Sequence, residues 1–257
     1  MNSESPLVSV ITIVYNGEKH LLGCINSVKN QAYPNYEHII VDGNSKDNTL
    51  SLLKATLHDR IRYISESDEG ISDAFNKGLR LAKGEIIAIL NVDDLFDHDT
   101  IINLVNFYLN NGAKSGLYYG DITYFNGEIS YHLKSDITKI WKYMSLFHPS
   151  CFVTRDVYEQ YGYFDVNLKY AMDCELIHRF ISHGVEFFYV QGLNVNFRLD
   201  GHSDKSYKKS LREFYESSRK YNYKPSLEFY YRWSLFKKII LKSPLGKYLQ
   251  PVYRRLA

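Results

Sequence analysis

The chain has 257 residues, of which 45% are hydrophobic and 23% charged, and it carries a net charge of +2. This length and balance exclude a low-complexity or repeat protein and suit one large hydrophobic core, alone or with a small appendage. The three cysteines, Cys24, Cys151 and Cys174, are widely spaced and lack the C-x-x-C pattern of a zinc or redox site, which favours a reduced, cytoplasmic environment.

Apolar runs and helical patterns alternate through the first 120 residues. The apolar runs are rich in β-branched residues and cover residues 7–14, 38–41, 61–64 and 86–90. Helical spacing of apolar residues covers residues 21–28, 50–57, 71–82 and 101–109. Strands that are apolar on both faces and linked by helices predict an α/β fold with a parallel sheet and right-handed crossovers. The first run is too short for a membrane span and lacks the basic flank of a signal peptide, so we expect a strand there.

Polar loops containing glycine or paired acids follow the four predicted strands. They read YNGE (residues 15–18), DGNSKD (42–47), SESDEG (65–70) and NVDD (91–94). Because the carboxyl ends of parallel strands meet at one edge of a sheet, where ligands bind, we expect these loops to line one cleft. Neither G-x-G-x-x-G after the first strand nor G-x-x-x-x-G-K-[ST] occurs, which excludes a dinucleotide fingerprint and a P-loop.

Two adjacent carboxylates, Asp93 and Asp94, end the fourth loop. Like charges this close raise one pKa, so a site that holds them offers a place for a cation or accepts the strain. The alternative is an ordinary polar turn in which Asp94 caps the next helix.

Shorter elements follow from about residue 117. The segments at residues 117–125 and 128–133 flank Asn126 and Gly127, a pair that is typical of a β-hairpin. A helix is predicted to start near Asp173, and helices rich in Tyr and Lys follow residue 205, with Pro225 and Pro244 as breakers. We expect a main domain over residues 1–215 and a helical, basic extension over residues 216–257.

Four blocks of the sequence, in order, resemble family 2 glycosyltransferases with the GT-A fold. They are VSVITIVYNGEKHLLGCINSVKNQAYPNYEHIIVDGNSKDNT, DEGISDAFNKGLRLAKGEIIAILNVDD, HPSCFVTRDVYEQYGYFD and AMDCELIHRF. The resemblance covers roughly residues 6–200 and is strongest to bacterial enzymes that build capsule, O-antigen or exopolysaccharide. It implies a Rossmann-like, mostly parallel sheet flanked by helices. It also implies inverting, hexosyltransferase-type transfer from a nucleotide-sugar, in the first place a UDP-sugar, with Mg²⁺ or Mn²⁺.

The same resemblance assigns donor-binding residues. Asp42 matches the residue that accepts the uracil imide N–H. The first-loop wall of the base pocket is matched by Thr12, Tyr15, Asn16 and Glu18. Contact with the donor or its diphosphate is implied for Asp73, Asn76 and Lys77. Simpler roles stay open, since Tyr15 would also suit core-edge packing, Asn16 a turn and Lys77 a solvated helix surface.

A metal site is implied at the end of the fourth strand. Asp94 matches the metal ligand and Asp93 the position that faces the donor ribose or sugar. Asn91 stands at the first position of the usual D-x-D, where it keeps an oxygen but loses a charge. His202, in RLDGHSD, matches a late loop that closes on the diphosphate or metal, although a lone histidine is more often structural or exposed.

Asp173 is the candidate catalytic base. It shares a helix face with the apolar stripe that begins at Leu176, whereas Glu175 pairs with Arg179 on another face. An N-cap role for Asp173 is the alternative. On the acceptor side we expect His148, in FHPSCF, and Glu175.

The last 34 residues, 224–257, carry a charge of +7, so the preceding 223 residues carry −5. Aromatic residues interleaved with Lys and Arg suit an anionic membrane surface, at which a glycan or polyprenyl-diphosphate-linked acceptor would be met. The segment would equally suit a helix packed on the domain; no nucleic-acid partner is expected. We therefore expect a cytoplasmic enzyme, peripheral on the inner face of the membrane, of undetermined oligomeric state. The rival interpretations are an inactive GT-A scaffold subunit and a nucleotidyltransferase.

Overall fold

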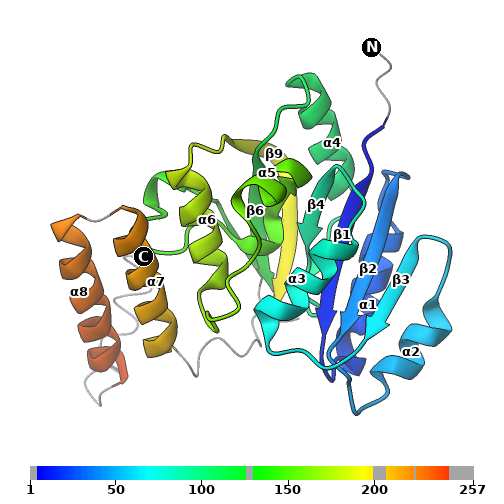
Figure 1. Ribbon diagram of the computed structural model, residues 1–257, viewed down its shortest axis with the longest axis horizontal. Helices are drawn as coiled ribbons and strands as arrows, with labels where there is room; N and C mark the ends of the chain where they lie inside the picture. Colours follow the sequence, from blue (N-terminus) through cyan, green and yellow to red (C-terminus); the bar gives the residue numbers. More distant parts are fainter. Residues whose placement is uncertain (1–4, 126–129, 199–206, 223, 243–257) are drawn as a thin grey trace.

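A computed structural model describes residues 5–125, 130–198, 207–222 and 224–242 of the chain (Figure 1). The predicted Asn126-Gly127 turn, His202 and Pro244 lie outside these residues. The two strands that flank the turn, β6 (Leu117–Phe125) and β7 (Ser130–Leu133), pair antiparallel, as the hairpin pattern predicts.

The first half of the chain forms the predicted alternation of strands and helices. Its elements are β1 (Val8–Val14), α1 (Glu18–Lys29), β2 (Tyr36–Asp42), α2 (Thr49–Thr56), β3 (Ile61–Ser65), α3 (Ile71–Leu81), β4 (Ile86–Ile89), β5 (Leu95–Phe96) and α4 (Thr100–Asn110). β1 pairs in parallel with both β2 and β4, and β2 pairs in parallel with β3. The predicted parallel sheet is confirmed.

The second half extends this sheet and adds helices at one end. Its further elements are 3-10 helices at Ile137–Lys139 and His148–Ser150, β8 (Cys151–Thr154), α5 (Arg155–Tyr161), α6 (Met172–Ser182), β9 (Phe187–Arg198), α7 (Tyr207–Tyr221) and α8 (Pro225–Lys242). The strand order is β3-β2-β1-β4-β8-β6-β9-β5, and β7 pairs with the last residues of β6, off this path. Only β5, β7 and β8 run against the other described strands, so the sheet is mostly parallel, as expected of the fold class.

Helices cover both faces of the sheet, which explains why its strands are apolar on both faces. In β1, Val10 packs in a cluster with α1 and α4, whereas its neighbour Ile11 packs in another cluster with α3 and α6. Gly78 allows the close approach of α3, because a Cβ there would lie 2.3 Å from Cγ2 of Ile11. The parallel pairing of β1 to β4 places the carboxyl ends of these strands at one edge of the sheet.

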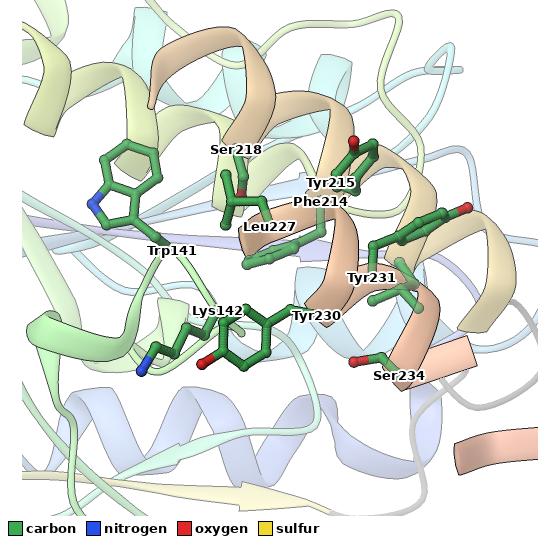
Figure 2. A pocket seen from close by; sticks show the side chains of 10 residues that line it. Trp141, Lys142, Phe214, Tyr215, Ser218, Leu227, Tyr230, Tyr231 and Ser234 are labelled. Carbon is green, nitrogen blue, oxygen red and sulfur yellow. The ribbon is translucent and has the colours of Figure 1, made fainter. Parts of the chain in front are cut away.

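The C-terminal helices pack on the body of the protein. α7 lies between α6 and α8 (Figure 1), and Phe214, Ser217 and Ser218 of α7 are buried. Figure 2 shows the contact of α7 and α8 with Trp141 and Lys142. The cavity left between them measures only about 10 Å³, so the contact is well packed. The domain boundary predicted at residue 215 falls inside α7, which is continuous. Among the described residues, no helix has the length and apolarity needed to cross a membrane.

Candidate functional site

Hydrogen bonds join the loops after β1 and β2 at the carboxyl edge of the sheet. The backbone N–H of Asn16 donates to Ser45 Oγ (2.8 Å), and Asn16 Oδ1 accepts from the backbone N–H of Lys46 (2.8 Å). Glu18 Oε2 accepts from the backbone N–H of Asn48 (2.9 Å). Asn16 has a left-handed backbone (φ 51°), which asparagine tolerates well. Asn16 and Glu18 thus use their side chains to join the two loops.

Asp42 ends β2 at the floor of this region. Its buried carboxylate accepts hydrogen bonds from the hydroxyls of Ser45 (2.5 Å) and Ser65 (2.6 Å). Tyr15 lies over Gly43 and is 62% exposed, so its ring is open to solvent. Asp42 and Tyr15 therefore stand at the same corner of the sheet edge.

Thr12 requires a correction, because it lies within β1 and not in the loop that follows. Its side chain is fully buried, and its Oγ1 lies 2.9 Å from His38 Nε2 of β2. The hydroxyl is used inside the sheet and does not reach the wall of a base pocket.

Helix α3 presents a charged group to the loop after β3. Lys77 Nζ donates to the carbonyl of Ser67 (2.6 Å) and pairs with Glu66 (3.0 Å) and Asp73 (3.3 Å). Burial opposes the charge of Lys77, but its bonds to Glu66 and Asp73 prevail and raise its pKa. Lys77 is thus a fixed positive charge at the sheet edge.

Asn76, on the same helix, also needs correction. It is 3% exposed, and its amide donates to the carbonyl of Phe164 (2.9 Å) and accepts from the N–H of Phe164 (3.0 Å). Both hydrogen-bonding ends of the amide are occupied by Phe164, so Asn76 anchors the segment after α5 and its amide is not available to a donor.

The carboxylate pair follows β4. Asp94 is 1% exposed, and its carboxylate accepts hydrogen bonds from the backbone N–H of Arg198 (3.2 Å) and from Asn91 Nδ2 (3.1 Å). Burial and then the charge of Asp93 raise the pKa of Asp94 to about 8. Asp93 is partly exposed beside it. Within the described parts of the chain, no cluster of three or more His, Cys, Asp or Glu side chains could hold a metal ion.

A cavity of about 340 Å³ opens between α3, α6 and the ends of β4, β6 and β9. Its polar lining comes from Asn91, His148 and Asp173. Its apolar lining comes from Ile71, Phe75, Tyr124, Met144, Phe147, Pro149, Met172 and Phe197. The end of β4 and the first turn of α6 are far apart in sequence, but both line this cavity.

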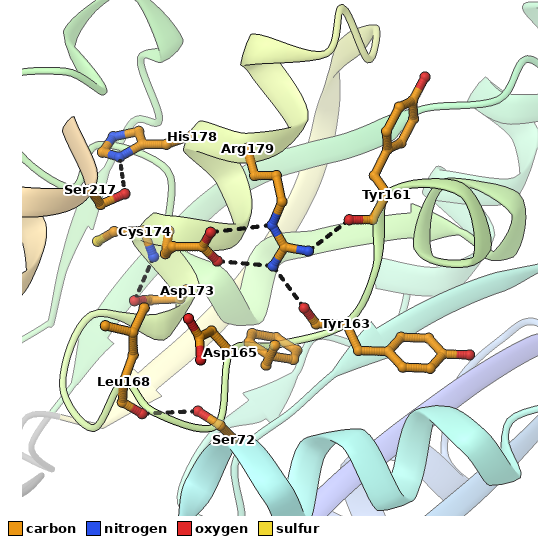
Figure 3. A network of polar contacts seen from close by, with 12 residues as sticks. Ser72, Tyr161, Tyr163, Asp165, Leu168, Asp173, Cys174, His178, Arg179 and Ser217 are labelled. Carbon is orange, nitrogen blue, oxygen red and sulfur yellow. Dashed lines mark hydrogen bonds and ion pairs between the residues drawn. The ribbon is translucent and has the colours of Figure 1, made fainter. Parts of the chain in front are cut away.

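Asp173 and His148 both line this cavity, and the charge of Asp173 acts on His148. α6 begins at Met172 and its N-cap is Ala171, so Asp173 lies in the first turn, where its Oδ1 accepts from the N–H of Cys174 (2.8 Å; Figure 3). His148 lies against the rings of Phe75 and Phe164, at 5.3 and 5.8 Å between centroids. Burial lowers the pKa of His148, and the nearby charge of Asp173 opposes this. A neutral imidazole and a carboxylate thus line the same cavity.

Glu175 does not face the cavity, so its expected acceptor-side role is wrong. It is 5% exposed and receives two hydrogen bonds from Arg179 (2.9 and 3.2 Å), the pairing that helix spacing predicts. Tyr221 of α7 donates a further bond (2.5 Å). Arg179 also binds the carbonyls of Tyr161 and Tyr163, at 2.7 Å each (Figure 3).

The aromatic walls of the cavity are not predicted from the sequence. Tyr124 comes from β6, Phe147 from the segment before β8, and Phe197 from β9; of the three, only Phe147 lies in a motif, FHPSCF. The alternation of apolar and polar residues at the end of β9 was the available signal, but it does not tell which strand lies opposite.

Comparisons with known proteins point to one family. The sequence model described as Glycosyl transferase family 2 matches residues 9–164, a range that includes Asp94 and ends before Asp173. An uncharacterized glycosyltransferase of Rickettsia typhi is 30% identical over 199 residues, 73% of this chain and 62% of that protein. A PGL/p-HBAD biosynthesis glycosyltransferase of Mycobacterium bovis is 27% identical over 172 residues, 65% of this chain and 66% of that protein. The chain spans less than two thirds of the length of these curated relatives.

Solved structures share the fold. Residues 1–349 of Staphylococcus aureus TarS in complex with UDP align with a TM-score of 0.68 at 18% identity, over 96% of this chain and 77% of that one. A mannosyltransferase of Pyrobaculum calidifontis in complex with GDP-Man and Mn²⁺ aligns with a TM-score of 0.68 at 18% identity, over 99% of this chain and 81% of that one.

Proposed function

The chain belongs to glycosyl transferase family 2, and we propose that it transfers a sugar from a nucleotide-sugar to an acceptor hydroxyl with inversion at the anomeric carbon. The observation that carries this proposal is the shared cavity of about 340 Å³, lined by Asn91 from the end of β4 and by Asp173 from α6. A carboxylate and a strand-end amide that line one cavity can both contact a single bound substrate.

The donor nucleotide is proposed to bind at the corner formed by Asp42 and Tyr15. Tyr15 offers an exposed ring face for a base, and Asp42 offers an acceptor for an imide N–H once its serine hydroxyls turn away. Lys77 supplies a positive charge beside the loop after β3, where a diphosphate would lie. UDP in the TarS complex supports a UDP-sugar as the first donor to test.

A divalent cation, Mg²⁺ or Mn²⁺, fits the donor atoms at the end of β4. Asp94 is a buried carboxylate whose pKa is raised to about 8, and a cation would compensate the charge that burial disfavours. Asp93 adds a second carboxylate, and hard cations leave further positions for phosphate oxygens, so a third protein carboxylate is not required. Asp94 and Asp93 would therefore hold the cation, which when bound neutralises a leaving diphosphate.

Asp173 is proposed as the general base. It accepts the proton of the acceptor hydroxyl, whose oxygen bonds to the anomeric carbon as the bond from that carbon to the diphosphate breaks. Attack on the face opposite the leaving group inverts the configuration. The apolar walls limit water in the cavity, and His148, held neutral by burial, can hydrogen-bond the acceptor.

The acceptor is proposed to be a glycan or a polyprenyl-diphosphate-linked sugar of a bacterial surface polysaccharide, met at the cytoplasmic face of the membrane. The aromatic walls suit the apolar face of a sugar ring. α8 supports contact with anionic lipid, because Phe229 and Phe236 are 66% and 52% exposed on a helix that lies in the basic end of the chain. Its other side packs on α7.

The test is an assay of nucleoside diphosphate release from UDP-, GDP- and dTDP-sugars with Mn²⁺ and a mixture of glycan acceptors. We expect release from one donor and its loss with EDTA. An absence of release from every donor, with nucleotide binding intact, would favour the rival interpretation of a non-catalytic binding subunit.

A further inference from the structure

Helix α7 contacts α6 and the segment before it at three points. Glu213 accepts from the backbone N–H groups of Lys169, Tyr170 and Ala171, at 3.3, 2.8 and 2.9 Å. Ser217 Oγ lies 2.8 Å from His178 Nδ1 (Figure 3), and Tyr221 donates to Glu175. The helix that carries Asp173 is thus held by α7 from before its first turn to its middle.

The contact made by Glu213 stands out because the N-cap residue of α6 makes no side-chain hydrogen bond to the helix. The N-cap residue is Ala171, whose side chain cannot accept a hydrogen bond. The N–H groups at a helix start need acceptors from elsewhere, and a carboxylate is a strong one. Glu213 supplies this acceptor from 42 residues away in the chain.

The same segment is anchored on its other side by α3. Ser72 Oγ donates to the carbonyl of Leu168 (3.2 Å; Figure 3), and Asn76 binds the backbone of Phe164. The backbone between these anchors and α6 therefore has its position set from both sides. Asp173 follows Ala171 by two residues, so a shift of the Glu213 contact is transmitted to the Asp173 carboxylate.

We propose that Glu213 is a positioning residue for the catalytic base: it fixes the start of α6 so that Asp173 stands at the cavity. Glu213 is not among the residues that line the cavity, so it acts through Asp173 and not on the substrate. This inference rests on the proposed function. It makes α7, which lies beyond the matched residues 9–164, a part of the catalytic unit.

Three variants of the full chain test the proposal. Glu213→Ala removes the acceptor, and we expect kcat to fall about 10- to 100-fold, the range expected when a reacting group is misplaced by about 1 Å. KM for the donor should stay within about two-fold, because the nucleotide corner is remote from α7. Glu213→Gln keeps an oxygen that can accept from Tyr170 and Ala171 and should retain most of kcat. Glu216→Ala is the matched control on the same helix, where Glu216 makes an exposed pair with Arg212, and it should match wild type.

A double-mutant cycle separates positioning from general damage. In the Asp173→Asn background, Glu213→Ala should cause no further loss of kcat, because the group that Glu213 positions is already disabled. An equal loss in both backgrounds, or a Glu213→Ala enzyme as fast as wild type, would overturn the proposal. If Glu213→Ala does not fold, Glu213→Asp carries the same cycle, since the shorter side chain cannot reach all three N–H groups.

The assays distinguish a failure of the proposed function from a failure of the proposed role of Glu213. A wild-type protein with no turnover on any donor removes the function and this inference together. An active wild type, with Asp173→Asn impaired and Glu213→Ala unimpaired, removes the inference alone.

Discussion

Replacing Asp94 with Asn tests whether the protein accepts strain at the end of β4 in order to hold a cation. Asp94 is 1% exposed, and burial together with Asp93 raises its pKa from an ordinary 3.8 to about 8. Asn has the same shape and no charge. Its carbonyl can still accept from the N–H of Arg198, and rotation of the Asn91 amide can satisfy the new NH₂ group.

The raised pKa sets both the sign and the size of the expected effect. Between pH 4 and 8 the folded state keeps a proton on Asp94 that the unfolded state has released, so stability is greatest at low pH and falls as the pH rises. The rise of the pKa from 3.8 to about 8 corresponds to at most about 6 kcal/mol, at about 1.4 kcal/mol for each pKa unit. Water entering at the strand end lowers this cost, so we expect Asp94→Asn to raise the free energy of unfolding by about 1–3 kcal/mol at pH 8.5.

The assay is urea unfolding in EDTA at pH 4.5 and pH 8.5, with turnover measured in Mn²⁺. Asp94→Asn should gain stability at the higher pH only and should lose nearly all turnover. Asp93→Asn, at a partly exposed position, is the control and should gain less. Equal stability of wild type and Asp94→Asn at pH 8.5 would refute the strain, and preserved turnover would refute the cation site.

Three further changes test other parts of the account. Asp173→Asn should lower turnover by about 10²- to 10⁴-fold, as for a lost general base, with UDP binding retained in calorimetry; unchanged turnover would rule it out as the base. Burial lowers the pKa of His178 to about 4, although the Ile140 carbonyl and Glu175 oppose this shift. The stability that the neutral His178 contributes is therefore complete above pH 6.5 and is lost as the pH falls towards 4. The loss amounts to up to about 3 kcal/mol, at about 1.4 kcal/mol per pKa unit. Thermal unfolding should follow this dependence in wild type and show a flatter one in His178→Asn; parallel curves would contradict it. The double variant Phe229→Glu, Phe236→Glu should reduce co-sedimentation with anionic liposomes at low salt, because α8 loses its exposed aromatic side chains. Tyr143→Glu, at another exposed aromatic residue, should not reduce it. Equal losses in both would mean that the added negative charge, and not the loss of α8 contacts, weakens binding.

Local periodicity predicts much of this fold. The apolar run at residues 7–14 and the helical spacing at residues 71–82 appear in the structure as β1 and α3, because both patterns reflect burial on nearby elements. The strands β8 and β9 are not distinguished by the sequence. Their places depend on pairings with β4 and β6, which no local pattern encodes.

For the site, too, the sequence predicts what depends on a single element and misses what depends on contacts between distant elements. Helix geometry predicts different faces for Asp173 and Glu175, and the structure places Asp173 at the cavity and Glu175 against Arg179. Thr12 and Asn76 were misplaced because their partners, His38 and Phe164, lie 26 and 88 residues away. Glu213 was not predicted, for its role depends on the docking of α7 against the start of α6.

The anomeric configuration of the released or transferred sugar tests the central claim most directly. With an α-linked nucleotide-sugar, NMR of the first product formed should show the β configuration, because Asp173 activates a hydroxyl that attacks from the face opposite the diphosphate. A first product with the α configuration would mean retention, and would contradict direct displacement with Asp173 as the base.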